Sequence, residues 1–381
     1  MEPRKVESKG GTDGGIWWQQ MRFRFGELFS GPGGMALGAH IAAQQIGKIF
    51  LEHAWANDYD NDTVATYVRN IPGASEDSVF SADVKQLDIG ALTPIDGFAF
   101  GFPCNDFSQV GEQKGTLGKF GPLYSYGVEV LNRHSPKWFV AENVGGLRSS
   151  NGGDAFPRIL SDLSQAGNMG GYKLVSHLYR FEEYGIPQAR HRIMVVGIRS
   201  DLDVEFKVPA TAPFSTIDNS AKTRLTVPPI PPDARNNELT RQSQRVVERL
   251  RHIKPGQNAF NADLPDHLKL NVAGAQISQI YKRLDPNKPS YTVTGSGGGG
   301  THVYHWSEPR ALTNRERARL QTFPDDFVFL GGKESVRKQI GMAVPVEGAR
   351  VVFDALFRSF LGITYESTEA NMARYMTNFG H

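Results

Sequence analysis

The sequence predicts an α/β protein with a doubly wound, mostly parallel, Rossmann-like sheet and a smaller irregular domain. Apolar runs typical of strands alternate with helical patterns from about residue 20 to residue 200. The first of these runs ends in a glycine-rich turn that leads into a helix, which is the form of a nucleotide-binding βα unit. From about Asp201 the alternation stops, and a segment rich in Pro, Ser and Thr follows.

The composition limits the classes of protein to consider. The chain has 381 residues, enough for one large and one smaller domain, each with its own core. Its 42 basic and 40 acidic residues give a net charge of +2, which neither requires nor excludes a nucleic-acid partner. A single cysteine excludes an internal disulfide and a cysteine-based zinc cluster, and fits a reducing cytosol. No apolar run approaches the roughly 20 residues of a membrane span, and residues 1–15 lack the apolar core of a signal peptide, so we expect a cytoplasmic protein.

Apolar periodicity and turn residues predict the order of elements. Strands are expected at 23–29, 49–56, 79–82, 95–100, 137–141, 172–179 and 193–198, and helices at 35–46, 63–68, 123–133, 155–165, 242–252, 313–323, 334–340 and 346–360.

The glycine turn at 30–35 and the acids after the second strand are candidates for binding a nucleotide-like ligand. Glycines let a ligand approach the backbone, and the helix N-terminus favours negative charge. An acid about 20 residues beyond the glycines, here Asp58, commonly binds the hydroxyls of a ribose. Two alternatives stay open: the glycines serve turn geometry alone, or the acid caps the next helix. Asp58 and Asp60 can divide these two roles.

The only cysteine, Cys104, lies beyond the strand expected at 95–100 and before a loop, 111–121, that contains several glycines. A lone thiol at the carboxyl end of a strand is a candidate nucleophile. The alternative is a small buried side chain with a packing role. The loop, with Lys114 and Lys119, suits a mobile lid that meets phosphates, and a merely solvated loop is the alternative.

Taken in order, the motifs of this chain resemble those of the DNA cytosine-5 methyltransferases of bacterial restriction–modification systems. The resemblance covers about 20–200 and 283–360. Two positions depart from the family pattern: Asn105 stands where Gln is usual, and Met342 where Asn is usual. The motifs that carry the resemblance are Phe29-Ser30-Gly31-Pro32-Gly33-Gly34, Pro103-Cys104, Glu142-Asn143-Val144, Gln188-Ala189-Arg190-His191-Arg192, Arg310 to Phe327, and Gln339-Ile340-Gly341-Met342-Ala343-Val344-Pro345.

The resemblance implies a sheet that binds S-adenosylmethionine, with no metal, and an irregular domain that recognises the DNA target. It divides the chain into a flexible tail (1–20), a catalytic domain (21–200), a target-recognition domain (201–288), a stretch with the C-terminal part of the recognition region and the return to the catalytic domain (289–365), and a C-terminal tail (366–381). The implied cofactor contacts are Phe29, Ser30, Gly31, Gly33, Gly34, Asp58, Tyr59, Asp83, Pro103, Ala343 and Val344.

The resemblance also implies catalytic and DNA-binding residues. Cys104 would attack C6 of a flipped-out cytosine, Glu142 would hold the base, and Arg190 and Arg192 would hold a phosphate or the cytosine O2. Double-stranded DNA is the expected partner, a cognate restriction endonuclease is a possible second one, and the protein is expected to act as a monomer. The implied DNA contacts are Ser108, Gln109, Arg190, Arg241 and Arg245.

Four other functions fit less well. A related tRNA cytosine methyltransferase would carry a Cys-Phe-Thr signature, but the only cysteine here is already assigned. A non-catalytic DNA-binding relative would not need Cys104, Glu142 and Arg192 together. An NAD-type dehydrogenase would use the glycine turn but would leave those three residues without a role. A methyltransferase for adenine or an exocyclic amine would carry an Asp/Asn-Pro-Pro-Tyr loop, and the sequence has none.

Overall fold

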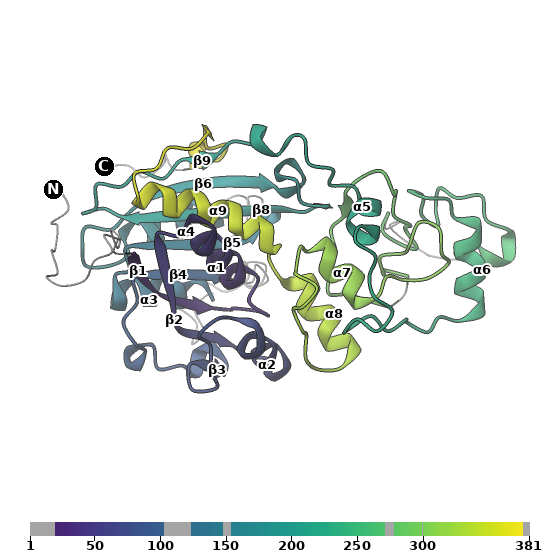
Figure 1. Ribbon diagram of the computed structural model, residues 1–381, viewed down its shortest axis with the longest axis horizontal. Helices are drawn as coiled ribbons and strands as arrows, with labels where there is room; N and C mark the ends of the chain where they lie inside the picture. Colours follow the sequence, from purple (N-terminus) through teal and green to yellow (C-terminus); the bar gives the residue numbers. More distant parts are fainter. Residues whose placement is uncertain (1–19, 103–122, 148–153, 271–277, 299, 376–381) are drawn as a thin grey trace, which may run out of the picture.

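The computed structural model describes residues 20–102, 123–147, 154–270, 278–298 and 300–375, and its centre is a seven-stranded sheet (Figure 1). The strands lie in the order β3-β2-β1-β4-β5-β8-β6. Their bounds are β1 (Met21–Leu28), β2 (Ile49–Asp58), β3 (Val79–Ser81), β4 (Gly97–Gly101), β5 (Trp138–Val144), β6 (Tyr172–Arg180) and β8 (His191–Arg199). The first five strands in that order are parallel, and β8 runs antiparallel to both β5 and β6. The expected mostly parallel sheet is therefore confirmed.

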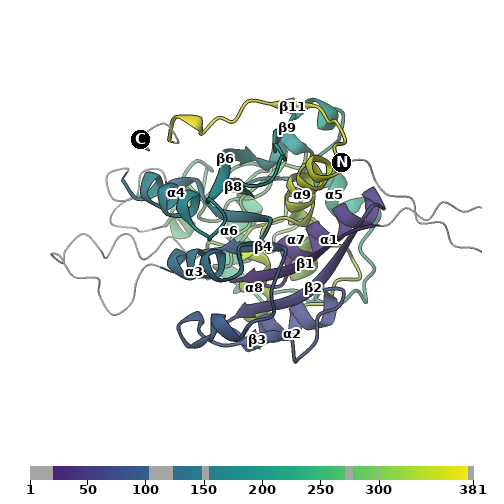
Figure 2. The same ribbon diagram turned by 90° about the vertical axis from the view of Figure 1, so that its left-hand side faces the viewer.

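Helices cover both faces of this sheet, as Figures 1 and 2 show. One face carries α1 (Gly34–Ile46), α2 (Asn61–Asn70) and α9 (Val346–Phe360), and the other carries α3 (Tyr124–His134) and α4 (Ala155–Gln165). Each face has its own group of buried apolar residues. Every strand and helix expected from the sequence is present, with ends shifted by a few residues. Helices on both faces confirm the doubly wound arrangement. The strands of such a sheet are buried on both sides, which explains their nearly continuous apolar runs.

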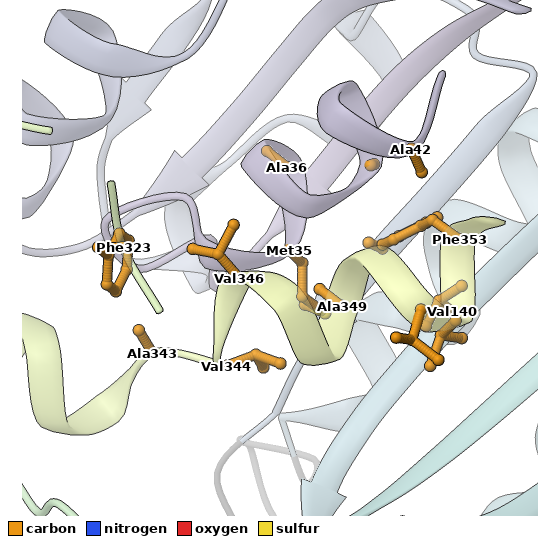
Figure 3. Packing of buried hydrophobic residues seen from close by; sticks show 14 of the residues in the cluster. Met35, Ala36, Ala42, Val140, Phe323, Ala343, Val344, Val346, Ala349 and Phe353 are labelled. Carbon is orange, nitrogen blue, oxygen red and sulfur yellow. The ribbon is translucent and has the colours of Figure 1, made fainter. Parts of the chain in front are cut away.

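The last long helix, α9, packs along α1 although the two lie at opposite ends of the described chain. Gly38 of α1 permits this close approach, because a Cβ there would lie 2.7 Å from the Cβ of Ala349. Figure 3 shows Met35 of α1 beside Ala349 in the same contact. A Cβ added at Gly34 would collide with the carbonyl oxygen of Val344. The contact therefore brings the segment before α9 directly against the glycine turn before α1.

A second, smaller core lies apart from the sheet, around α6 (Gln244–His252), at the far end of the molecule in Figure 1. Leu225, beyond the boundary expected at 201, belongs to the main core, and the small core extends past 288 to Ala311, in the stretch expected to hold the C-terminal part of the recognition region. The division into domains stays a prediction. Proline-rich, irregular backbone shows no periodicity, so its buried residues could not be recognised from the sequence. The small core consists of Leu250, Ile253, Ala259, Leu264, Tyr281, Tyr304 and Ala311.

Short elements connect the two cores. The strand β7 (Gln188–Ala189) pairs in parallel with β10 (Ser290–Tyr291). The helices α7 (Asn314–Leu320) and α8 (Lys333–Met342) lie between the sheet and α6 (Figure 1). A capping box starts α7: Thr313 and Glu316 bond to each other's backbone N–H groups.

The segment that follows α9 is packed against the sheet domain. Its strand β11 (Ser367–Thr368) pairs antiparallel with β9 (Val208–Pro209). Further along, Met372 is 1% exposed within the second face's core. The expectation of a loose tail over 366–381 is therefore wrong for 366–375, where a strand pairing and one apolar anchor hold the chain. Residues 376–381 and the expected N-terminal tail up to residue 19 lie outside the described residues.

Asn371 attaches this C-terminal segment to β6 and supports a stability prediction. Its Oδ1 accepts a hydrogen bond from the N–H of Leu178 (2.8 Å), and its Nδ2 donates to the Leu178 carbonyl (3.1 Å). Asn371→Ala should lower the free energy of unfolding by about 1 kcal/mol, because the segment loses its side-chain bonds to the strand. Urea denaturation measures the change. Glu369→Ala, an exposed change in the same segment, is the control; equal midpoints for the two variants would contradict the prediction.

Glu27 on β1 is a fully buried carboxyl group in the main core. Its Oε2 accepts a hydrogen bond from the hydroxyl of Tyr67 (3.0 Å), and its Oε1 has no partner among the described residues. Burial raises the pKa of Glu27 to about 8, and the nearby carboxylate of Asp58 adds to the rise. The side chain is therefore protonated at neutral pH in the folded protein.

This burial predicts a pH dependence of stability. Between pH 4.5 and about 8 the unfolded chain releases the Glu27 proton while the folded chain keeps it, so the contribution of Glu27 to stability is lost as the pH rises. Glu27→Gln removes this dependence, so its stability relative to wild type should rise by on the order of 3 kcal/mol from pH 4.5 to pH 7. Urea unfolding at several pH values measures the slope. Free energies of unfolding that change in parallel with pH in wild type and Glu27→Gln would refute the prediction. The control is Glu52→Gln, a change at a partly exposed position on β2.

Candidate active site

A cavity of about 450 Å³ opens at the carboxyl ends of the parallel strands. Open α/β sheets commonly bind ligands at this edge, outside the strand ends. The cavity lies between the glycine turn, the ends of β2 to β5, and the segment between α8 and α9. The residues predicted from the sequence that line it are Phe29, Ser30, Gly31, Gly34, Asp58, Tyr59, Asp83, Glu142, Ala343 and Val344.

The glycine turn forms one wall of the cavity. Gly31 has a φ of 54°, in the left-handed region, and its N–H donates to Oδ2 of Asp58 (2.9 Å). A Cβ at Gly31 would meet no atom within 4 Å, so the space beside the turn is open. Gly33 differs, because it does not line the cavity and a Cβ there would lie 2.6 Å from Cδ1 of Ile71. The expected cofactor contact of Gly33 is therefore not supported: this glycine serves the turn, with a φ of 97°, and the packing of α1.

The two acids at the end of β2 make different contacts, and of the two roles that the sequence left open the structure shows one, the helix cap. Asp60 is the N-cap of α2, and its Oδ1 accepts a hydrogen bond from the N–H of Thr63 (2.9 Å). Asp58 lines the cavity and also accepts from the backbone N–H groups of Gly31 and Asp60. Burial raises the pKa of Asp58 above its usual value, and these two N–H groups oppose the rise. Asp58 thus closes the glycine turn and presents a carboxyl group to the cavity.

Glu142, one of the residues that line the cavity, forms an ion pair with Arg192. The Nε of Arg192 lies 2.8 Å from Oε1 of Glu142, and each side chain is 13% exposed. Glu142 faces Gly101 across the β4–β5 pairing. A Cβ at Gly101 would lie 3.1 Å from Oε2 of Glu142, so the glycine leaves this oxygen its space. Oε2 thus lies beside Gly101, and both residues line the cavity.

Asn143 fixes the backbone at the exit of β4. Its Nδ2 donates to the carbonyl of Phe102 (2.9 Å), and its Oδ1 accepts from the N–H of Val144 (2.7 Å). Phe102 is the last described residue before the segment that carries the cysteine. Asn143 therefore has a structural role at this point of the backbone. Cys104, Pro103, Ser108, Gln109 and the departing Asn105 lie outside the described residues.

Arg190 is not placed to contact DNA, contrary to expectation. The side chain is 2% exposed, and its guanidinium donates to the carbonyls of Val293 (3.0 Å), Gly341 (3.1 Å) and Met342 (3.4 Å). Burial lowers the pKa of Arg190, and the charge of Arg192 lowers it further. Of the two arginines expected to act together, only Arg192 reaches Glu142. Arg190 instead ties the sheet to the segment that lines the cavity.

Arg241 and Arg245 lie on the surface of the small region, away from the cavity. Arg241 precedes α6 and Arg245 lies in its first turn. The Nη2 of Arg245 donates to the carbonyl of His267 (2.9 Å). Their contact with DNA stays a prediction.

Several lining residues were not anticipated. Five of them are direct neighbours of predicted positions, as Asn57 is of Asp58, and Gly101 ends the strand before the cysteine motif. Asn57 donates to the carbonyls of Phe80 and Ala82 (both 2.9 Å), which joins the ends of β2 and β3. Adjacency to a motif was the available signal for these residues. The unanticipated lining residues are Met35, Asn57, Ala82, Val84, Lys85, Gly101, Leu123 and Met342.

The part of the chain that the structure describes contains neither a candidate metal site nor a candidate membrane-spanning helix. No group of three or more His, Cys, Asp or Glu residues there could hold a metal ion. Within the same ranges, no helix is long and apolar enough to cross a membrane.

Comparisons with known proteins identify the family of this chain. The family profile described as C-5 cytosine-specific DNA methylase matches residues 23–358. The type II methyltransferase M.BbvI of Brevibacillus brevis is 57% identical over 355 residues, which is 91% of this chain and 94% of the relative. M.NgoFVII of Neisseria gonorrhoeae, another type II methyltransferase, is 40% identical over 327 residues, covering 84% of this chain and 83% of the relative.

Solved structures agree in fold. A prophage-encoded protein of E. coli, described as a candidate DNA modification methyltransferase, has a TM-score of 0.65 and 21% identity, covering 90% of this chain and all of its own. The Dnmt2 methyltransferase of S. pombe has a TM-score of 0.56 at 19% identity, with the same coverage of this chain. Because the profile spans most of the chain and M.BbvI is so similar, the chain belongs to the C-5 cytosine-specific DNA methylase family and is a DNA cytosine-5 methyltransferase.

Proposed function

We propose that the protein transfers a methyl group from S-adenosylmethionine to C5 of a flipped-out cytosine in a specific duplex sequence, through a covalent bond between Cys104 and C6. The observation that carries the proposal is the position of Glu142. This carboxylate, paired with Arg192, lines the same cavity as the glycine turn and the 342–344 segment. A methyl donor and a base-holding acid can therefore act in one space.

The residues of the cavity fit this cofactor. The turn at Gly31 leaves room for close approach, and Asp58 offers a carboxylate at the distance along the chain typical of a ribose-binding acid. Tyr59 and Asp83 lie at the outer part of the lining, where an adenine could be held by stacking and a hydrogen bond. When bound, S-adenosylmethionine would supply an electrophilic methyl group.

The protein would make cytosine reactive through two groups. The thiolate of Cys104 would add to C6, which breaks the C5–C6 double bond and makes C5 a nucleophile toward the methyl group. Glu142 would accept a hydrogen bond from the exocyclic amine and would share or give a proton to N3 as the thiolate adds, while the contact of Arg192 with Oε1 fixes the orientation of the acid. Loss of the C5 proton would then release the thiolate by β-elimination.

The target base lies inside a duplex, so it must leave the stack before it can reach this cavity. Flipping costs a few kcal/mol of stacking and pairing. We propose that the loop with Ser108 and Gln109 closes on the flipped base, and that the region around α6, with Arg241 and Arg245, reads the DNA. We also propose a monomer in the bacterial cytosol that protects host DNA from a restriction endonuclease acting on the same site.

Trapping on a modified base tests the covalent step. In the presence of S-adenosylmethionine, duplex DNA with 5-fluorocytosine at the target site should form an SDS-stable complex, because after methyl transfer to C5 the fluorine cannot leave as a proton does. Cys104→Ser should abolish the complex, and mass spectrometry should assign the bond to Cys104 in the wild type. Methylation sequencing of exposed DNA identifies the site to use. A complex formed by Cys104→Ser would refute the step, and methylation of RNA alone would instead indicate the tRNA alternative.

Removal of the charge at Glu142 tests the role of the acid. Glu142→Gln keeps the shape but not the carboxylate, so turnover should fall by about 10²–10⁴-fold. Binding of S-adenosylhomocysteine should stay close to wild type, because the change preserves the size and shape of the side chain that lines the cavity. Single-turnover methylation and calorimetry measure the two effects. Glu205→Gln, an exposed carboxylate that pairs with Lys207, is the control; wild-type turnover in Glu142→Gln would exclude the proposed role.

A further inference from the structure

Lys338 on α8 contacts Tyr59, which follows β2 and lines the cavity. The Nζ of Lys338 lies 2.8 Å from the hydroxyl oxygen of Tyr59. Tyr59 is 61% exposed, so little else on the protein surface covers its ring. The hydrogen bond thus joins two walls of one cavity, because the same helix ends in Met342, another lining residue.

The ammonium leaves the faces of the ring open. Nζ is 5.2 Å from the ring centroid and 2.8 Å from the hydroxyl oxygen. These two distances place the charge beyond the hydroxyl end of the ring, rather than over its centre. A planar ligand can therefore stack on Tyr59 without displacing Lys338.

Both ends of this contact are anchored. On the helix, the residues after Lys338, Gln339 and Ile340, are buried, and a Cβ at Gly295 would lie 3.1 Å from the Cα of Lys338. On the other side, Tyr59 stands between Asp58 and Asp60, whose carboxylates accept backbone hydrogen bonds. The hydrogen bond to Tyr59 raises the pKa of Lys338, and the charges of Asp60 and Asp58 add to the rise. The ammonium therefore stays protonated and remains a donor at neutral pH.

We propose that Lys338 is a positioning residue for the cofactor: it holds the Tyr59 ring in place so that the ring can stack on the adenine. This inference rests on the proposed function, in which the cavity binds S-adenosylmethionine. An exposed lysine contact adds little to folding stability, because water competes for the charge and the long side chain loses freedom. Its value here is preorganisation, because a ring held in its bound orientation loses less freedom when the ligand arrives.

A double-mutant cycle on ligand binding tests the proposal. Calorimetry with S-adenosylhomocysteine should show that Lys338→Met and Tyr59→Phe each raise Kd by about threefold to tenfold, the effect of one net hydrogen bond. The double variant should lose no more than the larger single loss, because both changes remove the same contact. In methylation assays, Lys338→Met should raise KM for S-adenosylmethionine more than it lowers kcat. Lys338→Arg retains a cationic donor and should recover most of the affinity.

A matched control separates this contact from a general effect of charge on α8. Lys333→Met removes the same charge from the same helix, but Lys333 donates to the carbonyl of Leu239 and does not line the cavity. Its Kd should equal that of wild type. Additive losses in the double variant, or an unchanged Kd in Lys338→Met, would overturn the positioning role. Failure of the wild type to bind S-adenosylhomocysteine would instead refute the proposed function.

Discussion

The close contact between Gly34 and the carbonyl of Val344 is the constraint on which the site depends. A side chain at position 34 has no space there, so the start of α1 and the segment before α9 share one wall of the cavity. Gly38 repeats the constraint one turn further along α1, against Ala349. Helices that approach this closely gain dispersion contacts along their length, but only where both partners are small. Segments near the two ends of the described chain therefore meet in this wall of the cavity, and the ends of β2 to β5 supply further lining.

Three buried polar side chains keep this wall in register with the rest of the molecule. Oε1 of Gln188 accepts from the N–H of Val293 (2.8 Å), and its Nε2 donates to Oε1 of Gln321 (2.8 Å). Arg190 donates to the carbonyls of Val293 and Gly341. Polar groups at this depth are costly unless they are bonded, so each of these residues is tied to its partners. The segment that leads into β8, the backbone at Val293 and the last turn of α8 are thus held together by hydrogen bonds.

Much of the fold and cavity could be predicted, because the signals were local. A strand, a glycine turn and a helix lie next to each other in sequence, and so do Asp58 and Tyr59 at the end of β2. The predictions that failed depended on contacts between distant residues. Arg190 is buried because carbonyls at residues 293 and 341 surround it, and no pattern around residue 190 records them. The packing of 366–375 likewise depends on pairing with β9. That strand has only two residues, too few to show a pattern in the sequence.

Strand geometry explains why Arg192, and not Arg190, reaches the acid. In the antiparallel β5–β8 pair, Arg192 lies opposite Val144, and Glu142 is two residues earlier on β5. Residues two apart on a strand share a face, and a long side chain can reach this diagonal neighbour. Asn143, between them, must face the other way, and there it bonds to Phe102. Arg190 precedes β8 and lies outside this pairing, so its guanidinium finds backbone carbonyls instead. The alternation of the strand thus sends neighbouring polar side chains to different partners: Glu142 to the cavity and Arg192, and Asn143 to the backbone at Phe102.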